Sequence, residues 1–395
     1  MPKNCKILIC GAGVAGPCLA YWLQQFGFEP AIIERSSSLR TGGYIVDFWG
    51  LGFEVAEKMG LVTGLRQVGY QIDRVRIVNS RGRTTGGFSV EAFKDVLGDR
   101  YLSVLRSDLS RAIFDRLGTN VRTIFDNTIS ALRQTDDYVE VTYERGGSER
   151  FDLVVGAGGL HSPVRNLVFG PSEWFEHYLG YQVASFSTSG YGRNDPRAYI
   201  TYSAPGLQVS RYSLRGGRTV FLLTFVAVRK LHLSDSQAQK LHLARVFGHA
   251  GWECKEMLGE LDRCQDLYFD SVSQIHMNTW HKGRVALVGD ASSCASLLAG
   301  QGSSLAMAGA YILAGELARA AGDHRVAFIA YERLLQPLMA RKQRAAEKFA
   351  RSFVPETRIG MVFRNQVTKL MSHPTIVRLA MGHLLRDGVT LPNYS

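Results

Sequence analysis

Three separated glycine-rich segments contain the residue types in this chain that are best suited to chemistry. They are Gly11-Ala12-Gly13-Val14-Ala15-Gly16, the segment 156–165 (GAGGLHSPVR), and Gly289-Asp290 followed by Gly300-Gln301-Gly302. Glycine has no side chain, so the backbone can come close to a phosphate or a flat ring. One such segment is weak evidence. Three in this order indicate a site for FAD, a cofactor that has both a diphosphate and a ring.

The first segment predicts a nucleotide-binding turn between a strand and a helix. A buried strand is expected at 6–10 and a helix from about 14 to 26. The first glycine allows the tight turn, the second lets a pyrophosphate approach the helix N-terminus, and the third lets helix and strand pack. An acid follows 18 residues after Gly16, close to the spacing of about 20 for a ribose-binding carboxylate. The cofactor-binding residues predicted here are Gly11, Gly13, Ala15, Gly16, Glu34 and Arg35.

The third segment predicts a contact with the ring of the cofactor. A long helix is expected to begin after Gly302 and to run to about residue 321. Its first N–H groups, at Ser303 and Ser304, and its positive dipole end would stabilise a ring that becomes anionic on reduction. Gly300 and Gly302 would let the backbone lie close to that ring.

Together these motifs resemble the group A FAD-dependent aromatic monooxygenases, typified by p-hydroxybenzoate hydroxylase. They are more similar still to the branch that acts on polyketides and tetracyclines, over residues 1 to about 340. The resemblance implies that Arg106 contacts the ribityl-phosphate region of FAD and that Asp290 hydrogen-bonds the ribityl and pyrophosphate region. It also implies that Gly43 lies in a loop near the isoalloxazine ring.

Two positions depart from the pattern of that family. Gly158 stands where the family usually has an aspartate linked to FAD and NAD(P)H binding, which puts nicotinamide recognition in question. After Asp290 the family often has His and then Pro, and here Ser293 and Ser296 or Leu297 occupy those places. The motif of the flavin halogenases is absent from the sequence.

The resemblance implies a reaction in which NADPH or NADH reduces FAD and oxygen then gives a C4a-hydroperoxide. Its terminal oxygen would pass to an electron-rich carbon, or insert beside a ketone, of a mid-sized aromatic or polyketide-like molecule. The alternatives are an FAD-linked dehydrogenase or oxidase on the same fold, and a flavin-binding protein without catalysis. Asp47 is the candidate catalytic residue, although fixing local backbone is an alternative role for it. Arg211 and Tyr212, on a predicted pocket-wall strand, are the candidate substrate contacts.

The chain is predicted to be an α/β protein, with a Rossmann-like parallel sheet interleaved with an antiparallel substrate sheet and followed by C-terminal helices. The FAD-binding domain is expected at 1–70, 101–174 and 276–340, and the substrate domain at 71–100 and 175–275. A C-terminal helical region is expected at 341–395. Strands are expected at 138–143 and 151–156, joined through a turn at Gly146-Gly147.

Composition narrows the class of protein. No stretch approaches the about 20 apolar residues of a membrane span. The six cysteines form no Cys-x-x-Cys pair and no metal-ligand spacing, so no metal site is predicted, and reduced thiols indicate a cytoplasmic protein. Residues 319–395 hold 13 Lys/Arg and 5 Asp/Glu, so a charge of +8 out of +11 lies there. No nucleic-acid motif accompanies this charge, which favours a solvated helix face. Partners are expected to be a small-molecule substrate and oxygen, in a monomer or homodimer.

Overall fold

A mostly parallel sheet lies at the N-terminal end of the molecule. The computed structural model describes residues 3–394 except 41, 194, 196, 234, 374, 378 and 380–388. The strand order is β17-β18-β11-β1-β2-β7, with β17 antiparallel at one edge. The central strands are apolar because both faces of the sheet are covered. The strands are β1 (Lys6–Cys10), β2 (Glu29–Ile33), β7 (Arg122–Ile124), β11 (Leu153–Gly156), β17 (His281–Lys282) and β18 (Val285–Leu287).

Helices cover one face of this sheet, and a small second sheet covers the other. Apolar residues of α1 and α10 pack together with the sheet in the largest core cluster of the described residues. On the opposite face, the antiparallel sheet β10-β9-β8 and helix α6 close a second core. The helices of the first face are α1 (Ala15–Gln25), α2 (Leu51–Lys58), α3 (Val62–Val68), α5 (Arg106–Asp115), α10 (Gly302–Arg319) and α11 (His324–Phe353). The second face has β8 (Ile129–Gln134), β9 (Val139–Tyr143), β10 (Ser148–Phe151) and α6 (Pro163–Val168).

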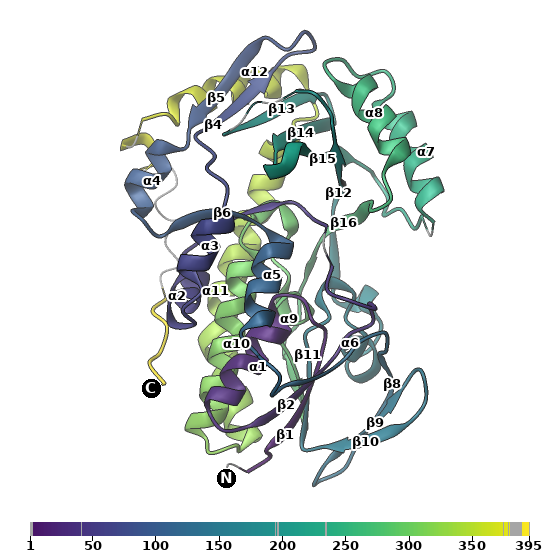
Figure 1. Cartoon of the computed structure of the whole chain (residues 1–395), viewed down its shortest axis with the longest axis vertical. Helices are drawn as coiled ribbons and strands as arrows, with labels where there is room; N and C mark the ends of the chain where they lie inside the picture. The colour runs from purple at the N-terminus through teal and green to yellow at the C-terminus, as the bar shows by residue number, and fades with distance from the viewer. Residues whose placement is uncertain are drawn as a thin grey trace.

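A larger sheet lies at the other end of the molecule (Figure 1). Its order is β16-β12-β15-β14-β13-β4-β5, antiparallel except where β13 runs parallel to β4. Helices α7 and α8 cover its outer face through an apolar cluster, and α12 packs on the edge strand β5. The elements are β4 (Arg74–Val78), β5 (Thr84–Ser89), α4 (Glu91–Leu97), β12 (Glu176–Ser189), β13 (Ala198–Ala204), β14 (Leu207–Ser213), β15 (Arg218–Val226), α7 (Ser236–Phe247), α8 (Cys254–Arg263), β16 (Tyr268–Ile275) and α12 (Arg358–Leu370).

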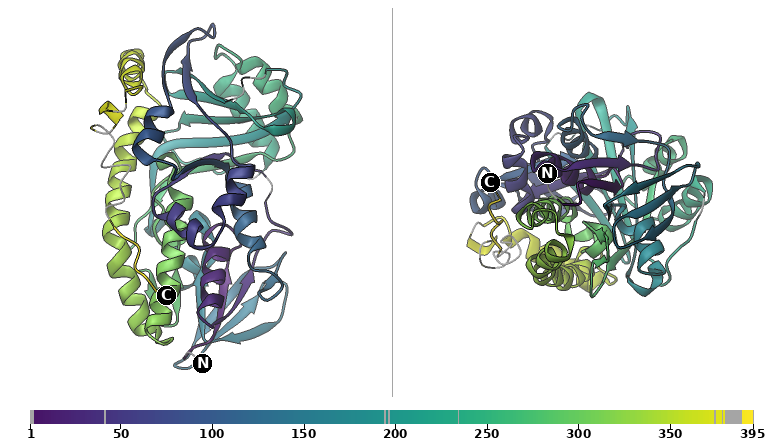
Figure 2. Two further views of the ribbon diagram at one scale, coloured as in Figure 1. Left: turned by 60° about the vertical axis from the view of Figure 1, so that its left-hand side comes forward. Right: turned by 90° about the horizontal axis from the view of Figure 1, so that it is seen from below.

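A two-stranded ribbon joins the two ends of the molecule. Strands β3 (Ile45–Trp49) and β6 (Tyr101–Leu105) pair antiparallel, with Asp47 directly opposite Ser103. Helix α5 follows β6 at once, and α11 runs beside α10 along the length of the molecule (Figure 2). The ribbon therefore lies where the helices of one end meet the large sheet of the other.

The predicted fold class is confirmed: the chain is an α/β protein with a Rossmann-like parallel sheet and a separate, mainly antiparallel sheet. One predicted element is wrong. The segment 151–156 is two strands in two sheets, because the chain changes sheets at Asp152, whose backbone N–H and side chain both bond Lys6. The turn at 146–147 joins β9 to β10 instead. The domain limits stay a prediction, and residues 374, 378, 380–388 and 395 of the predicted C-terminal region lie outside the described residues. None of the described helices has the length and apolar character that crossing a membrane requires.

Candidate flavin site and its neighbours

The three glycines of the first segment have three different physical roles. Gly11 has φ +120°, and a Cβ there would lie 2.6 Å from the carbonyl oxygen of Ala157 on the neighbouring strand end. A Cβ on Gly16 would lie 1.9 Å from the oxygen of Gly11, so helix and turn pack backbone to backbone. A Cβ on Gly13 would meet nothing within 4 Å. The open side of the turn is therefore at Gly13, beside the start of α1, where a diphosphate would sit.

The carboxylate of Glu34 closes this turn from the end of β2. One of its oxygens accepts from the N–H of Ala12 at 2.7 Å, and the other accepts from the N–H of Ser36 at 2.9 Å. A carboxylate has about four lone-pair sites, so capacity remains for a ribose hydroxyl. Arg35 is exposed beside it, and Ala15 is buried at the first position of α1.

Arg106 and Asp290 form the charged part of the site, and they come from strand ends far apart in the sequence. Arg106 begins α5 after β6, and Asp290 follows β18. Burial raises the pKa of Asp290, and the charge of Arg106 works against that rise. Burial alone would lower the pKa of Arg106, but Tyr44, Tyr268 and Asp290 raise it. The two side chains thus stabilise each other in a setting with little water, as an anchor for polar groups of a bound cofactor would require.

The loop before β3 is tied to the same place. The N–H of Arg106 donates to the carbonyl oxygen of Tyr44 at 3.1 Å. Gly43 has φ +136°, and a Cβ there would lie 3.9 Å from the Cβ of Arg106. Ser110, on the next turn of α5, donates to the carbonyl oxygen of Gly13 at 3.1 Å. The structure therefore brings the predicted residues Gly13, Gly43 and Arg106 to one place.

The third segment reaches this place from the opposite side. Gly300 is left-handed, with φ +67°, and a Cβ on Gly302 would lie 3.8 Å from a carboxylate oxygen of Asp290. Helix α10 begins at Gly302, so the N–H groups of its first turn have no partner inside the helix. The hydroxyl of Ser304 donates to the carbonyl oxygen of Trp49, which anchors this helix end to the ribbon, while Ser303 is half-buried.

The second segment supports Asp290 from behind. Ser162 caps α6 by accepting from the N–H of Arg165 at 3.2 Å. The guanidinium of Arg165 is fully buried and donates to the carbonyl oxygen of Ala291 at 3.1 Å and to the hydroxyl of Ser172 at 3.0 Å. Arg165 thus holds the turn that carries Asp290. Gly158 is exposed, and a Cβ there would lie 3.0 Å from Cδ of Pro163, so this turn is tight even for alanine.

Asp47 lies on the ribbon with two hydroxyls beside it. One carboxylate oxygen accepts from Tyr101 at 2.6 Å and from Ser103 at 2.7 Å. The side chain of Asp47 is exposed, yet burial raises the pKa of its carboxyl, and both hydroxyls oppose that rise. Asp47 also raises the pKa of Tyr199, which is about 12 mainly through burial, so the Asp47 carboxyl lies on the side of the ribbon that faces β13 of the large sheet.

Sequence reasoning missed Tyr101 and Ser103. Tyr101 and Ser103 are two positions apart, so on a strand their side chains point to the same face, and this spacing can be seen in the sequence. Only the pairing of β3 with β6 brings both hydroxyls to Asp47.

The structure assigns Arg211 and Tyr212 roles other than the predicted substrate contact. Arg211 is buried on the outer face of the sheet, where Nε donates to Glu253 at 2.6 Å and Nη2 to Asp195 at 2.7 Å. Tyr212 points to the opposite face, as neighbours on a strand must. Its oxygen accepts from the N–H of Ile45 at 2.6 Å, and its ring stacks on Tyr199. Both side chains therefore have structural partners: Arg211 forms ion pairs, and Tyr212 bonds the ribbon.

Comparison with known proteins agrees with the motifs. The FAD binding domain family matches residues 4–329. A flavin-dependent monooxygenase of Legionella longbeachae is 34% identical over 401 residues, which covers 100% of this chain and 99% of that protein. The crystal structures of the tetracycline destructases Tet(55) and Tet(51) align with TM-scores of 0.85 and 0.82, at 32% and 34% identity, over 100% of both chains. The HpxO structure of Klebsiella pneumoniae with FAD and uric acid, at 21% identity and a TM-score of 0.80, shares the fold.

The resemblance seen in the sequence is thereby confirmed, and the fold, the glycine turns and the relatives agree. The chain belongs to the FAD-binding family of flavin-dependent monooxygenases.

Proposed function

We propose that this protein is an FAD-dependent monooxygenase that uses NADPH or NADH and molecular oxygen. Its substrate is a mid-sized aromatic or polyketide-like molecule, which it hydroxylates or into which it inserts oxygen. The observation that carries this proposal is the convergence of three glycine turns on Arg106 and Asp290, with Gly13 left open for a diphosphate.

The residues of this chain fit FAD, which when bound supplies hydride acceptance and oxygen activation. The open turn at Gly13 and the start of α1 would hold the diphosphate, and Glu34 would hold the ribose. Arg106 and Asp290 would bind the polar chain between diphosphate and ring. The free N–H groups at the start of α10 would stabilise negative charge on the ring without a lysine.

Asp47 is the proposed contact for a substrate hydroxyl. One of its oxygens is fixed by Tyr101 and Ser103, and no hydrogen bond to the other oxygen occurs among the described residues. That free oxygen can accept a hydrogen bond from a phenol or enol of the substrate and take up its proton. A carboxyl with a raised pKa is the better proton acceptor near neutral pH.

The relatives support the proposed substrate class. Two tetracycline destructases, which are named for a polyketide antibiotic, match over their whole length at more than 30% identity. We therefore propose polyketide-like ring systems as the first substrates to test. A cytoplasmic location, with access to NAD(P)H, and a monomeric or homodimeric state complete the proposal, and the six cysteines are free thiols.

Anaerobic stopped-flow absorbance tests the function. The flavin of the purified protein should be bleached by NADPH or NADH, and a tetracycline or polyphenol substrate should accelerate the bleaching. Admission of oxygen should then give a product with one added oxygen atom by mass spectrometry. Bleaching by the substrate alone would support the dehydrogenase or oxidase alternative. A preparation that neither binds FAD nor responds to any nicotinamide would end the proposal.

A further inference from the structure

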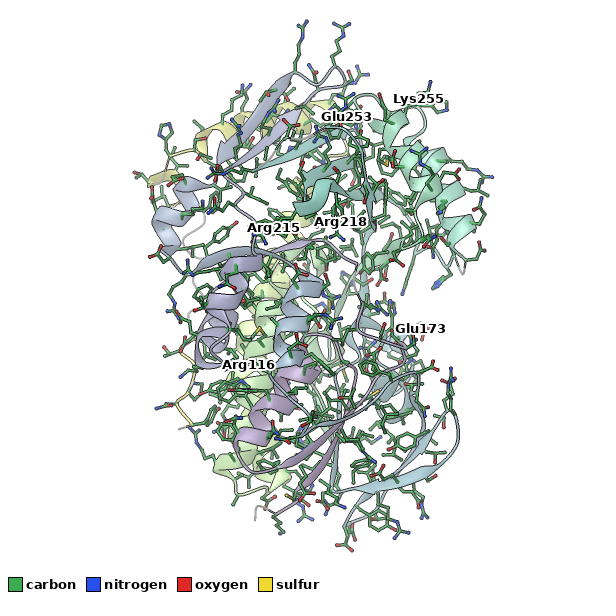
Figure 3. All side chains as sticks on the ribbon, in the orientation of Figure 1. Arg116, Glu173, Arg215, Arg218, Glu253 and Lys255 are labelled. Atoms are coloured by element: carbon green, nitrogen blue, oxygen red, sulfur yellow. The ribbon has the colours of Figure 1, made fainter. Side chains whose placement is uncertain are left out.

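Three arginines from two different layers converge next to the proposed flavin site. Arg111 lies on α5, Arg215 on the turn η3 (Arg215–Gly217) and Arg218 at the start of β15. We call these three residues the arginine cluster. All three are exposed, and the charges of all three act on one carboxyl, that of Asp108. Figure 3 labels Arg215 and Arg218 at the end of the large sheet that lies over α5.

The arginine cluster makes no ion pair with a carboxylate in the described part of the chain. Within the described part of the chain, no carboxylate lies within 4.0 Å of any of the three guanidinium groups. All three guanidinium groups act on Asp108, and burial raises the pKa of that carboxyl, which weakens it as a counter-charge. Arg215 is nevertheless held in place, because it donates to the carbonyl oxygen of Gly69 at 2.7 Å and lies 5.4 Å from the ring centre of Tyr70.

The arginine cluster adjoins the flavin site through α5. Arg106, whose charge acts on Asp290, starts the same helix that carries Asp108 and Arg111. Two hydroxyls next to the cluster in sequence, those of Ser107 and Ser213, are buried without a partner in the described structure. Exposed positive charge on three arginines, one of them held in place, is the kind of surface that binds anionic groups.

We propose that the arginine cluster binds the phosphates of the nicotinamide cofactor, and in particular the 2′-phosphate of NADPH. This inference rests on the proposed use of NAD(P)H. Arginine is suited to phosphate because its planar fork can donate two parallel hydrogen bonds to the oxygens. The cluster also accounts for Gly158: with no carboxylate at that position, recognition of the reductant is supplied from α5 and the large sheet instead. The protein should therefore prefer NADPH to NADH.

Direct binding and anaerobic flavin reduction test this site on the FAD-loaded protein. The variants are Arg218→Gln, Arg111→Gln and the double variant, with Arg218→Lys to keep the charge. The matched control is Arg245→Gln on the outer helix α7, which removes the same charge elsewhere. Calorimetry measures the Kd of 2′,5′-ADP, and stopped-flow measures the dependence of flavin bleaching on NADPH and NADH. Each Gln variant should weaken 2′,5′-ADP binding and raise the half-saturating NADPH concentration on the order of tenfold, with a smaller change for NADH.

The outcomes separate this inference from the proposed function. Arg218→Lys should fall between the unsubstituted protein and Arg218→Gln, and Arg245→Gln should match the unsubstituted protein. The inference is overturned if the double variant binds 2′,5′-ADP and NADPH as tightly as the unsubstituted protein, or if neither ligand binds at all. It is also overturned if inorganic phosphate displaces 2′,5′-ADP at equal concentration, because the cluster would then be a general anion site. If 2′,5′-ADP binds through the cluster and NADPH never bleaches the flavin, the binding site stands and the monooxygenase proposal fails.

Discussion

Gly13 and Gly16 are three positions apart, yet alanine at each should impair a different property: FAD binding at Gly13 and the stability of the fold at Gly16. The Cβ of Gly16→Ala would lie 1.9 Å from a backbone oxygen, so helix and turn must separate. Such overpacking costs about 1–3 kcal/mol of the free energy of unfolding. The Cβ of Gly13→Ala meets nothing, and φ there is not positive, so the apoprotein should keep its stability or gain about 0.4–1 kcal/mol.

Gly16→Ala should be the less stable apoprotein, whereas Gly13→Ala should show the greater loss of FAD affinity. A methyl group at Gly13 occupies the space in which the diphosphate approaches the backbone. Losing one hydrogen bond to a charged phosphate costs about 1.5–3 kcal/mol, which is about 10- to 150-fold in Kd. Urea denaturation of the apoprotein measures the first quantity, and quenching of flavin fluorescence measures the second. Wild-type FAD affinity in Gly13→Ala, or an undiminished midpoint in Gly16→Ala, would refute this account of the turn.

Three other substitutions test the neighbours of the site. Asp47→Asn should gain stability relative to the unsubstituted protein as pH rises above about 4, since a raised folded pKa makes ionisation costly; urea midpoints against pH check this, and a parallel pH profile would contradict it. Tyr212→Phe leaves the N–H of Ile45 without its acceptor and should cost about 1–3 kcal/mol in urea denaturation; no loss would mean that the link is unimportant. Arg211→Met leaves Glu253 short of a counter-charge and should cost about 3 kcal/mol with an unchanged substrate KM; a raised KM in a stable variant would restore the substrate role.

Local patterns in the sequence were sufficient for the parts of the fold that short-range physics decides. The strand–turn–helix around Gly11 and the strand–glycine–acid at Asp290 are continuous in sequence, so their positions could be read directly. Segment 198–228 carries Pro-Gly and Gly-Gly pairs between apolar runs, a pattern typical of strands joined by tight turns. Helix α10 begins at Gly302, close to the start that the third glycine segment predicted.

Contacts that depend on the pairing of distant strands could not be predicted from the sequence. Asp47 was visible as an acid, but its partners lie 54 and 56 positions away, on a strand whose register the sequence does not state. Arg211 and Tyr212 were predicted to share a role, whereas side chains of adjacent strand residues point to opposite faces. Which face is covered depends on helices α7 and α8, which come later in the sequence. The change of sheet at Asp152 was hidden for the same reason.

The way the chain threads back and forth has a consequence for its synthesis. Strand β1 is made first, but its sheet is completed by β18, and α1 is covered by α10, nearly 300 positions later. Strand β4 likewise pairs with β13, and β5 packs against α12, and both partners are synthesised later. A ribosome-bound fragment that ends before Gly302 lacks α10, which packs on α1 and α2. Flavin capture is therefore an event that follows release of nearly the whole polypeptide, and a truncated chain should emerge colourless.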